Sequence, residues 1–179
     1  MRKLFWVLMI VVVAAVGAPA QKVKVAADPA ANLSAYKTYN WDKPLPPGNP
    51  MVQQTILASL EQALTAKGLK RVEDQGDITV VFLAATDTDV QMGYPSWYSK
   101  MGSAVSNGMD VGTQSWPVTR GMLVVDVVDN KTKNSVWRGS ATHTLEHGLT
   151  GNPVKDARTV EKPIKKSIEK MFKKFPQTA

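Results

Sequence analysis

The chain has 179 residues and no cysteine, and its 22 lysine and arginine residues exceed its 15 aspartate and glutamate residues by seven. The missing cysteine excludes disulfides, thiol catalysis and cysteine-bound metals. Residues 161–176 hold six lysines against only Glu161 and Glu169. The positive charge is therefore concentrated in one segment, which argues against a nucleic-acid-binding protein.

Residues 1–20 have the pattern of a cleavable secretory signal peptide. Two basic residues precede an unbroken apolar run over residues 4–17, and Ala18 and Ala20 are the small residues that signal peptidase reads. The run is shorter than the ~20 residues that span a bilayer core. We expect cleavage after Ala20 and a location outside the cytoplasm, either periplasmic or secreted. An uncleaved N-terminal anchor is the alternative.

The remaining residues, 21–179, have the length of a single domain. Alternating or β-rich sequence predicts strands at 22–27, 36–41, 69–72 and 78–85. Between them, Asn49 as N-cap, Pro50 in the first turn and Gly68 after the last turn predict a helix over 50–67.

The second half of the domain begins with a long connection. Residues 86–117 show no clear period and are rich in glycine, serine, threonine, methionine and aromatic residues. We expect a long loop here, which is functional, disordered, or a hairpin that the sequence does not resolve. Segments 120–129 and 135–146 around a polar turn predict a β-hairpin. An amphipathic helix ends the domain, and Pro163 either opens this helix or bends a longer one.

This element order predicts an α+β fold. Strands joined by hairpins form antiparallel or mixed sheets, and two amphipathic helices each need an apolar surface to cover. We therefore expect an antiparallel or mixed sheet with both helices packed on one face. The apolar side chains expected in the core between them are Ile56, Leu60, Leu64, Ile164, Ile168 and Phe172.

Four segments carry a family resemblance. The Asp-Pro and aromatic residues of 28–41, the valine-rich strand 121–129, the Val-Trp-Arg-Gly-Ser-Ala sequence 136–141 and the closing Lys-Phe-Pro of 174–176 resemble the bacterial envelope family catalogued as domain of unknown function number 4136. The resemblance implies an envelope protein without an assigned activity. Members often carry a lipobox cysteine, which this chain lacks.

The sequence indicates no catalytic, cofactor or metal site. His143 and His147 lie in a predicted strand, which places them ~13 Å apart, too far for one metal ion. No nucleophile elbow or phosphate loop is present. Asp126 and Asp129 are expected to be ordinary strand and turn residues.

Two groups of residues remain as candidates for binding. Exposed aromatic side chains in a long loop are typical partner contacts, and lysines along one helix face attract anionic surfaces. The partner candidates are Tyr94, Trp97, Tyr98 and Trp116, and the candidates for weak contact with an anionic membrane surface are Lys162, Lys165, Lys166, Lys170, Lys173 and Lys174.

The sequence therefore favours an exported envelope protein that is a non-enzymatic binding or assembly module. Its expected partner is an envelope protein or glycan, with no cofactor and no nucleic acid. The alternative is a hydrolase acting on an envelope polymer, with Asp126, Asp129 or His143 taking part.

Overall fold

A computed structural model describes residues 21–42, 49–93, 114–145 and 148–177; for 89–93 and 114–117 it describes only the backbone. The expected signal peptide at residues 1–20 lies outside the described residues. In the described part, no helix is both long and apolar enough to cross a membrane.

The described chain forms a mixed sheet of six strands in the order β1-β6-β5-β4-β2-β3. β2 pairs in parallel with β3 and β4, whereas the other pairings are antiparallel. A short 3-10 helix, η1, lies between β1 and β2. The elements are β1 (Lys22–Ala27), η1 (Leu33–Ala35), β2 (Thr38–Trp41), α1 (Pro50–Ala66), β3 (Lys70–Arg71), β4 (Ile78–Gly93), β5 (Gln114–Asp129), β6 (Ser135–Leu145) and α3 (Pro153–Phe172).

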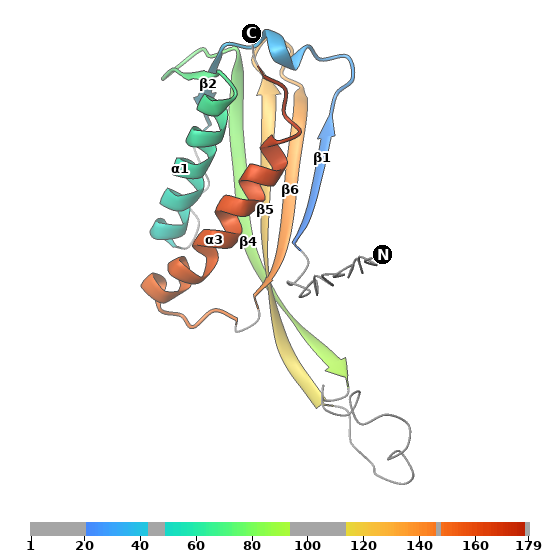
Figure 1. The fold of residues 1–179 in the computed structure, drawn as a ribbon, viewed down its shortest axis with the longest axis vertical. Helices are drawn as coiled ribbons and strands as arrows, with labels where there is room; N and C mark the ends of the chain where they lie inside the picture. The colour runs from blue at the N-terminus through green and yellow to red at the C-terminus, as the bar shows by residue number, and fades with distance from the viewer. Residues whose placement is uncertain (1–20, 43–48, 94–113, 146–147, 178–179) are drawn as a thin grey trace, which may run out of the picture.

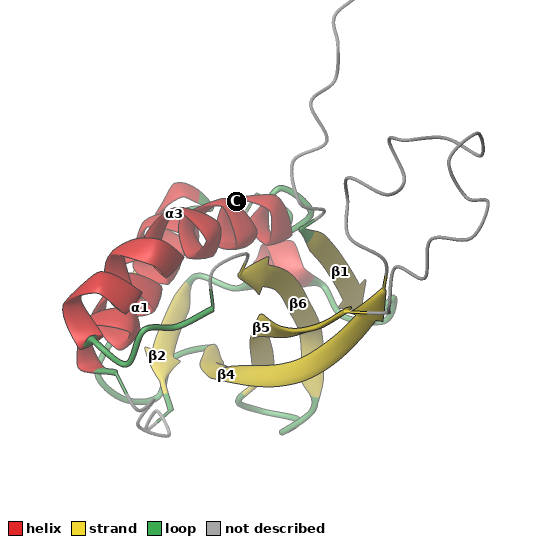
Figure 2. Cartoon of the chain, turned by 90° about the horizontal axis from the view of Figure 1, so that it is seen from below, coloured by secondary structure: helices red, strands yellow, loops and turns green. Residues whose placement is uncertain are grey.

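Both helices cover the same face of this sheet, as Figures 1 and 2 show. The α+β fold expected from the sequence is thus confirmed. Of the six apolar side chains expected between helices and sheet, five are buried, and Ile164 is half-buried and packs against the same core. Both helices begin at the same end of the sheet and run in the same direction (Figure 1).

The helix starts follow from their sequences. The side chain of Asn49 accepts hydrogen bonds from the backbone N–H groups of Met51 and Val52, and Pro50 occupies the first turn. Asn152 and Pro153 repeat this arrangement at the start of α3. The two starts are joined, because the Asn49 side-chain amide donates to the Pro153 carbonyl at 3.0 Å.

α3 is longer than the apolar stripe alone predicts, and Pro163 lies inside it rather than at its start. The proline has no backbone N–H to donate to the preceding turn. Its own carbonyl accepts hydrogen bonds from the Ser167 hydroxyl at 2.8 Å and the Gln21 side-chain amide at 2.9 Å. The Gln21 contact fastens the start of the described chain to α3.

The predicted loop 86–117 is shorter in the structure. Residues 86–93 extend β4 and residues 114–117 extend β5, and the two strands form a ribbon that projects beyond the helices (Figure 1). A hairpin was one of the interpretations of this segment, but its strands could not be located from the sequence. A two-stranded ladder needs no buried face, so apolar alternation is absent. Pro117 is tolerated there because a two-stranded ribbon has outward positions at which no N–H is needed.

Candidate functional site

A cavity of about 380 Å³ lies between the sheet and the two helices, at the end where both helices begin. Its walls come from β4, β5 and β6 below, from α1 and α3 above, and from the segment that leads into α3. The side chains and backbone that line it include Asn49, Val52, Ile56, Ala84, Thr86, Gly121, Leu123, Ala141, His143, Leu145, Leu149, Gly151, Pro153, Asp156, Val160, Pro163, Ile164 and Ser167.

The cavity exists because small residues meet on neighbouring strands. The register places Leu123 of β5 between Ala84 of β4 and Ala141 of β6. Two residues further along the strands, it places Gly121 between Thr86 and His143. A Cβ atom added at Gly121 would meet only the His143 carbonyl oxygen, at 3.9 Å. The sheet therefore leaves open space under the first turns of the helices.

The other end of the core is filled. Trp137 is 1% exposed, and its ring centroid lies 5.1 Å from that of Phe172 and 5.4 Å from that of Phe175. A Cβ atom at Gly139 would lie 2.7 Å from the Trp137 ring and 2.8 Å from the Met171 sulfur. The glycine at 139 is thus needed for close packing, whereas the glycine at 121 borders a void.

His143 contributes the only imidazole that lines the described cavity. Its side chain lies on the helix-facing side of β6, and its Nδ1 atom is buried without a hydrogen-bond partner among the described residues. This atom has almost no surface that a water molecule could touch, so the unpaired nitrogen is out of reach of a molecule in the cavity. His147 lies outside the described residues.

Asp156 lies at the cavity wall near the start of α3 and is buried. Its carboxylate accepts hydrogen bonds from the backbone and hydroxyl of Thr150 and from the backbone N–H of Gly151, at 2.8 to 3.0 Å. These bonds, that from the Thr150 backbone first, lower the pKa of Asp156 below its usual range. The residue is therefore a fixed negative charge that holds the loop before α3.

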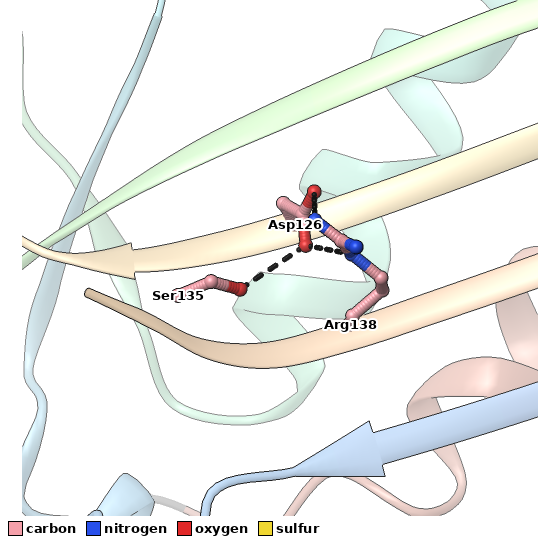
Figure 3. Close-up of polar contacts among 3 residues, drawn as sticks. All are labelled: Asp126, Ser135 and Arg138. Atoms are coloured by element: carbon pink, nitrogen blue, oxygen red, sulfur yellow. Dashed lines mark hydrogen bonds and ion pairs between the residues drawn. The ribbon is translucent and has the colours of Figure 1, made fainter.

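Asp126 and Asp129, the carboxylates of the hydrolase hypothesis, accept structural hydrogen bonds outside the cavity. Asp126 lies on the sheet face opposite the helices, where Arg138 donates two hydrogen bonds to it at 2.6 and 2.7 Å and Ser135 donates one at 3.2 Å (Figure 3). His143 lies on the other face of the sheet, opposite Gly121. Asp126 and His143 therefore do not converge on one cleft.

Asp129 stabilises the turn that follows β5. The Tyr36 hydroxyl donates to one carboxylate oxygen at 2.6 Å, and the backbone N–H groups of Lys131 and Thr132 donate to the other at 2.7 and 2.8 Å. The hydrogen bond from Tyr36 is the largest cause that lowers the pKa of Asp129 to about 2. Among the described residues, no group of three histidine, aspartate or glutamate side chains could hold a metal ion.

The structure describes the lysines proposed to contact a membrane, but only part of the aromatic group proposed to contact a partner. Tyr94, Trp97 and Tyr98 lie outside the described residues, and Trp116 has its backbone in β5 opposite Gln91, in the projecting ribbon. Four of the lysines lie on α3, and Lys173 and Lys174 directly follow it. Lys165 pairs with Glu161 at 2.6 Å and Lys173 with Glu169 at 3.2 Å. The other four have no ion pair within the described chain and follow one another at intervals of four residues: Lys162, Lys166, Lys170 and Lys174.

The fold and the cavity define a small α+β protein with two helices over one face of a mixed sheet and a void beneath their first turns. The chain belongs to the family described as Domain of unknown function (DUF4136), whose sequence profile matches residues 23–177. No protein with a curated description matches it.

Several solved structures are similar to this fold at low sequence identity. A PDZ domain protein from Parabacteroides distasonis has a TM-score of 0.53 at 14% identity, over 89% of this chain and 37% of that one. The PelC dodecamer from Paraburkholderia phytofirmans has a TM-score of 0.51 at 12% identity, over 89% and 99%. A minor lipoprotein from Acinetobacter baumannii has a TM-score of 0.41 at 13% identity, over 80% and 98%. At these identities the likeness concerns the fold alone.

Substituting Tyr36 by phenylalanine tests the structural role of Asp129. A carboxylate whose pKa in the folded state, about 2, lies below its ordinary 3.8 stabilises the fold above about pH 4 and loses this contribution as the pH falls towards 2. Without the Tyr36 hydroxyl, we expect a lower free energy of unfolding at neutral pH, by about 1 kcal/mol, and a shallower loss of stability between pH 4 and 2. Urea unfolding measured across this pH range checks both, and an unchanged pH dependence would contradict this role.

Proposed function

We propose that this protein is a non-enzymatic binding module of the bacterial envelope, and that the cavity beneath the helices is its ligand site. The envelope location is supported by the export pattern of residues 1–20 and by the family resemblance. We expect the exported protein to begin at Gln21, and an intact Met1 found by mass spectrometry would contradict cleavage after Ala20.

The observation that carries the proposal is the cavity itself. Ligand sites are mostly apolar voids of about 300–1,000 Å³ with a few polar groups that orient the ligand. This cavity has that size, and its lining is mainly apolar with a few polar residues such as Thr86, His143 and Ser167. A packed core of this size would lose dispersion contacts around such a void, so a ligand that fills it would gain them.

The arrangement of acidic groups favours binding over hydrolysis. General acid–base catalysis needs titratable groups that converge on one reacting atom. Asp126 and Asp129 already accept hydrogen bonds that hold a strand pair and a turn, and Asp156 holds the loop before α3. His143 lacks such a carboxylate partner among the described residues.

Substituting Gly121 by valine should occupy part of the cavity without unfolding the protein. The added side chain enters open space and improves β-propensity, so we expect a free energy of unfolding within about 1 kcal/mol of the native value. We expect the uncharged dye Nile red to bind the native protein at one site, with fluorescence enhancement, and the variant to bind it at least about tenfold more weakly. Fluorescence titration and thermal unfolding measure the two effects.

A matched control separates the cavity from the outer face of the sheet. Leu83 is 51% exposed on the face away from the helices, where a dye could also adhere. The variant Leu83→Thr should bind Nile red like the native protein. If it loses the dye, or if Gly121→Val keeps it, the cavity is not the ligand site.

The lysine face of α3 supports a second contact, with an anionic membrane surface. We propose that Lys162, Lys166, Lys170 and Lys174 provide it, since no ion pair within the described chain neutralises them. Each lysine near an anionic surface contributes about 1 kcal/mol, and salt screens this attraction over about 8–10 Å.

Replacing these four lysines by glutamine should abolish sedimentation with phosphatidylglycerol vesicles at low salt. The double variant Lys165→Gln and Lys173→Gln is the control, because both residues are paired with glutamates. We expect it to keep most of the binding. Absence of vesicle binding by the native protein at low salt would disprove the contact.

The ribbon of β4 and β5 supports the expected partner contact through Tyr94, Trp97, Tyr98 and Trp116. It projects beyond the helices, so the segment that joins its strands starts and ends away from the core (Figure 1). We propose that these aromatic residues contact an envelope protein or glycan.

The variant Trp97→Ala tests this contact. We expect a melting temperature close to that of the native protein and loss of the material that the native protein captures from envelope extract. A large drop in melting temperature would show that Trp97 is part of the core and would refute the partner contact.

A further inference from the structure

The six-stranded sheet has a free backbone edge along β4. β2 covers only the start of this edge, and its last residue, Trp41, lies opposite Val80. The Asp42 N–H donates to the Val80 carbonyl at 3.2 Å, so Val80 and every second residue after it point their backbone groups away from β5. On that side no other described residue makes a backbone hydrogen bond to the residues that follow, Phe82, Ala84, Thr86 and Thr88.

This part of β4 lacks the features that protect edge strands. Proteins prevent unwanted strand pairing with very short edge strands, with proline or lysine at the edge, or with β-bulges. β3, at the end of the sheet, has only two residues. Residues 82–88, by contrast, contain no proline and no lysine, and they pair with β5 without a shift in register. Such an edge can accept a further strand.

β1 forms the opposite edge of the sheet and is also free (Figure 1). The Asp28 N–H donates to the Val136 carbonyl at 2.9 Å, in continuation of the ladder with β6. Because the ladder alternates, Val23, Val25 and Ala27 point their backbone groups away from β6. No described residue makes a backbone hydrogen bond to them on that side.

The two edges match in direction and in charge. Three successive antiparallel pairings make β1 run opposite to β4, so β1 of one copy can extend the sheet of another copy as an antiparallel strand, with all helices on one face. By strand alternation, Lys22, Lys24 and Asp87 lie on the face away from the helices, and all three are exposed. None of them has an ion pair within the described chain.

We propose that copies of this protein associate head to tail, with β1 of one copy added to the free edge of β4 of the next. This contact goes beyond the proposed ligand site and does not depend on it. Because the two edges differ, each added copy offers a new free edge, and the association continues into a closed ring or a filament. The added strand also covers the half-buried Val23 and Val25 at the edge of the core.

Charge and strand length determine the register of this contact. Oppositely charged side chains directly across two strands stabilise their pairing, which places Lys24 opposite Asp87. In this register Asp28 and Pro29 end the added strand before it reaches the end of β2. The other pairs across the contact are Val23 with Thr88, Val25 with Thr86 and Ala27 with Ala84.

Two proline variants that each block one edge test this inference. Thr86→Pro removes an N–H from the β4 edge, and Val25→Pro removes one from the β1 edge. Neither N–H is used in a ladder of its own chain, so we expect both variants to keep the native circular dichroism. In sedimentation velocity, residues 21–179 of the native sequence should form species larger than a monomer, whose share rises with concentration.

We expect each proline variant alone to be a monomer and their equimolar mixture to form a dimer. In the mixture, the intact β1 of the Thr86→Pro chain can pair with the intact β4 of the Val25→Pro chain. A native protein that stays monomeric at every concentration would overturn the inference. Oligomers of either variant alone would also overturn it, because they would show that another surface mediates the association.

Charge reversal at exposed positions tests the register without a change to the backbone. Lys24→Glu and Asp87→Lys each place like charges opposite one another, and we expect each to weaken self-association by about fivefold. The double variant restores opposite charges and should recover most of the native association. Lys70→Glu, at an exposed lysine of β3 outside the contact, is the control and should associate like the native protein. Native-like association of both single variants, or no recovery in the double variant, would refute the proposed pairing.

Discussion

The gradient in side-chain size along the helix-facing side of the sheet determines the rest of the structure. At one end, the ring of Trp137 lies over Gly139 and against Phe172 and Phe175, and there is no room even for one added methyl group. At the other end, Ala84, Gly121 and Ala141 meet on neighbouring strands. The helices pack closely against the aromatic end of this face and leave a void at the end of small residues. The cavity is thus a consequence of strand register and residue size.

Hydrogen bonds at the starts of the two helices fix the walls of this void. Asn49 and Asn152 each satisfy the first backbone N–H groups of their own helix, and Asn49 also joins the two helix starts through the carbonyl of Pro153. Asp156 fixes the loop before α3, and Gln21 fastens the start of the described chain to the same helix. These bonds are made by backbone and side-chain polar groups around the cavity. They fix the positions of the cavity walls without filling the cavity.

The sequence predicted most helices and strands and the packing of both helices on one sheet face. The patterns that indicate them, such as helix caps and apolar spacing, each lie within a short segment. Asn49, Pro50 and Gly68 predicted α1 to within a residue, and the apolar spacing around Leu60 and Ile168 predicted the buried faces of both helices. The ends of β4 and β5 were missed because a two-stranded ribbon has no buried face. The cavity was missed for another reason: Ala84, Gly121 and His143 are far apart in sequence, and only the register of three strands brings them together. The sequence did single out His143, but for metal binding and catalysis, and it gave no sign that its Nδ1 atom is buried and unpaired.

The distribution of polar groups connects the fold with the proposed ligand. On the outer face and in the turns, Asp126 and Asp129 are paired with Arg138 and Tyr36, so their charges contribute to the fold rather than to a site. In the core the requirement is stricter, because an unpaired polar atom there costs free energy in a low-dielectric environment. The Nδ1 atom of His143 carries this cost, since it has no hydrogen-bond partner among the described residues. The described lining of the cavity offers no cationic side chain, and its carboxylate, Asp156, already accepts hydrogen bonds from the loop before α3. A molecule that fills the cavity would therefore gain mainly by restoring the dispersion contacts that the apolar walls lack.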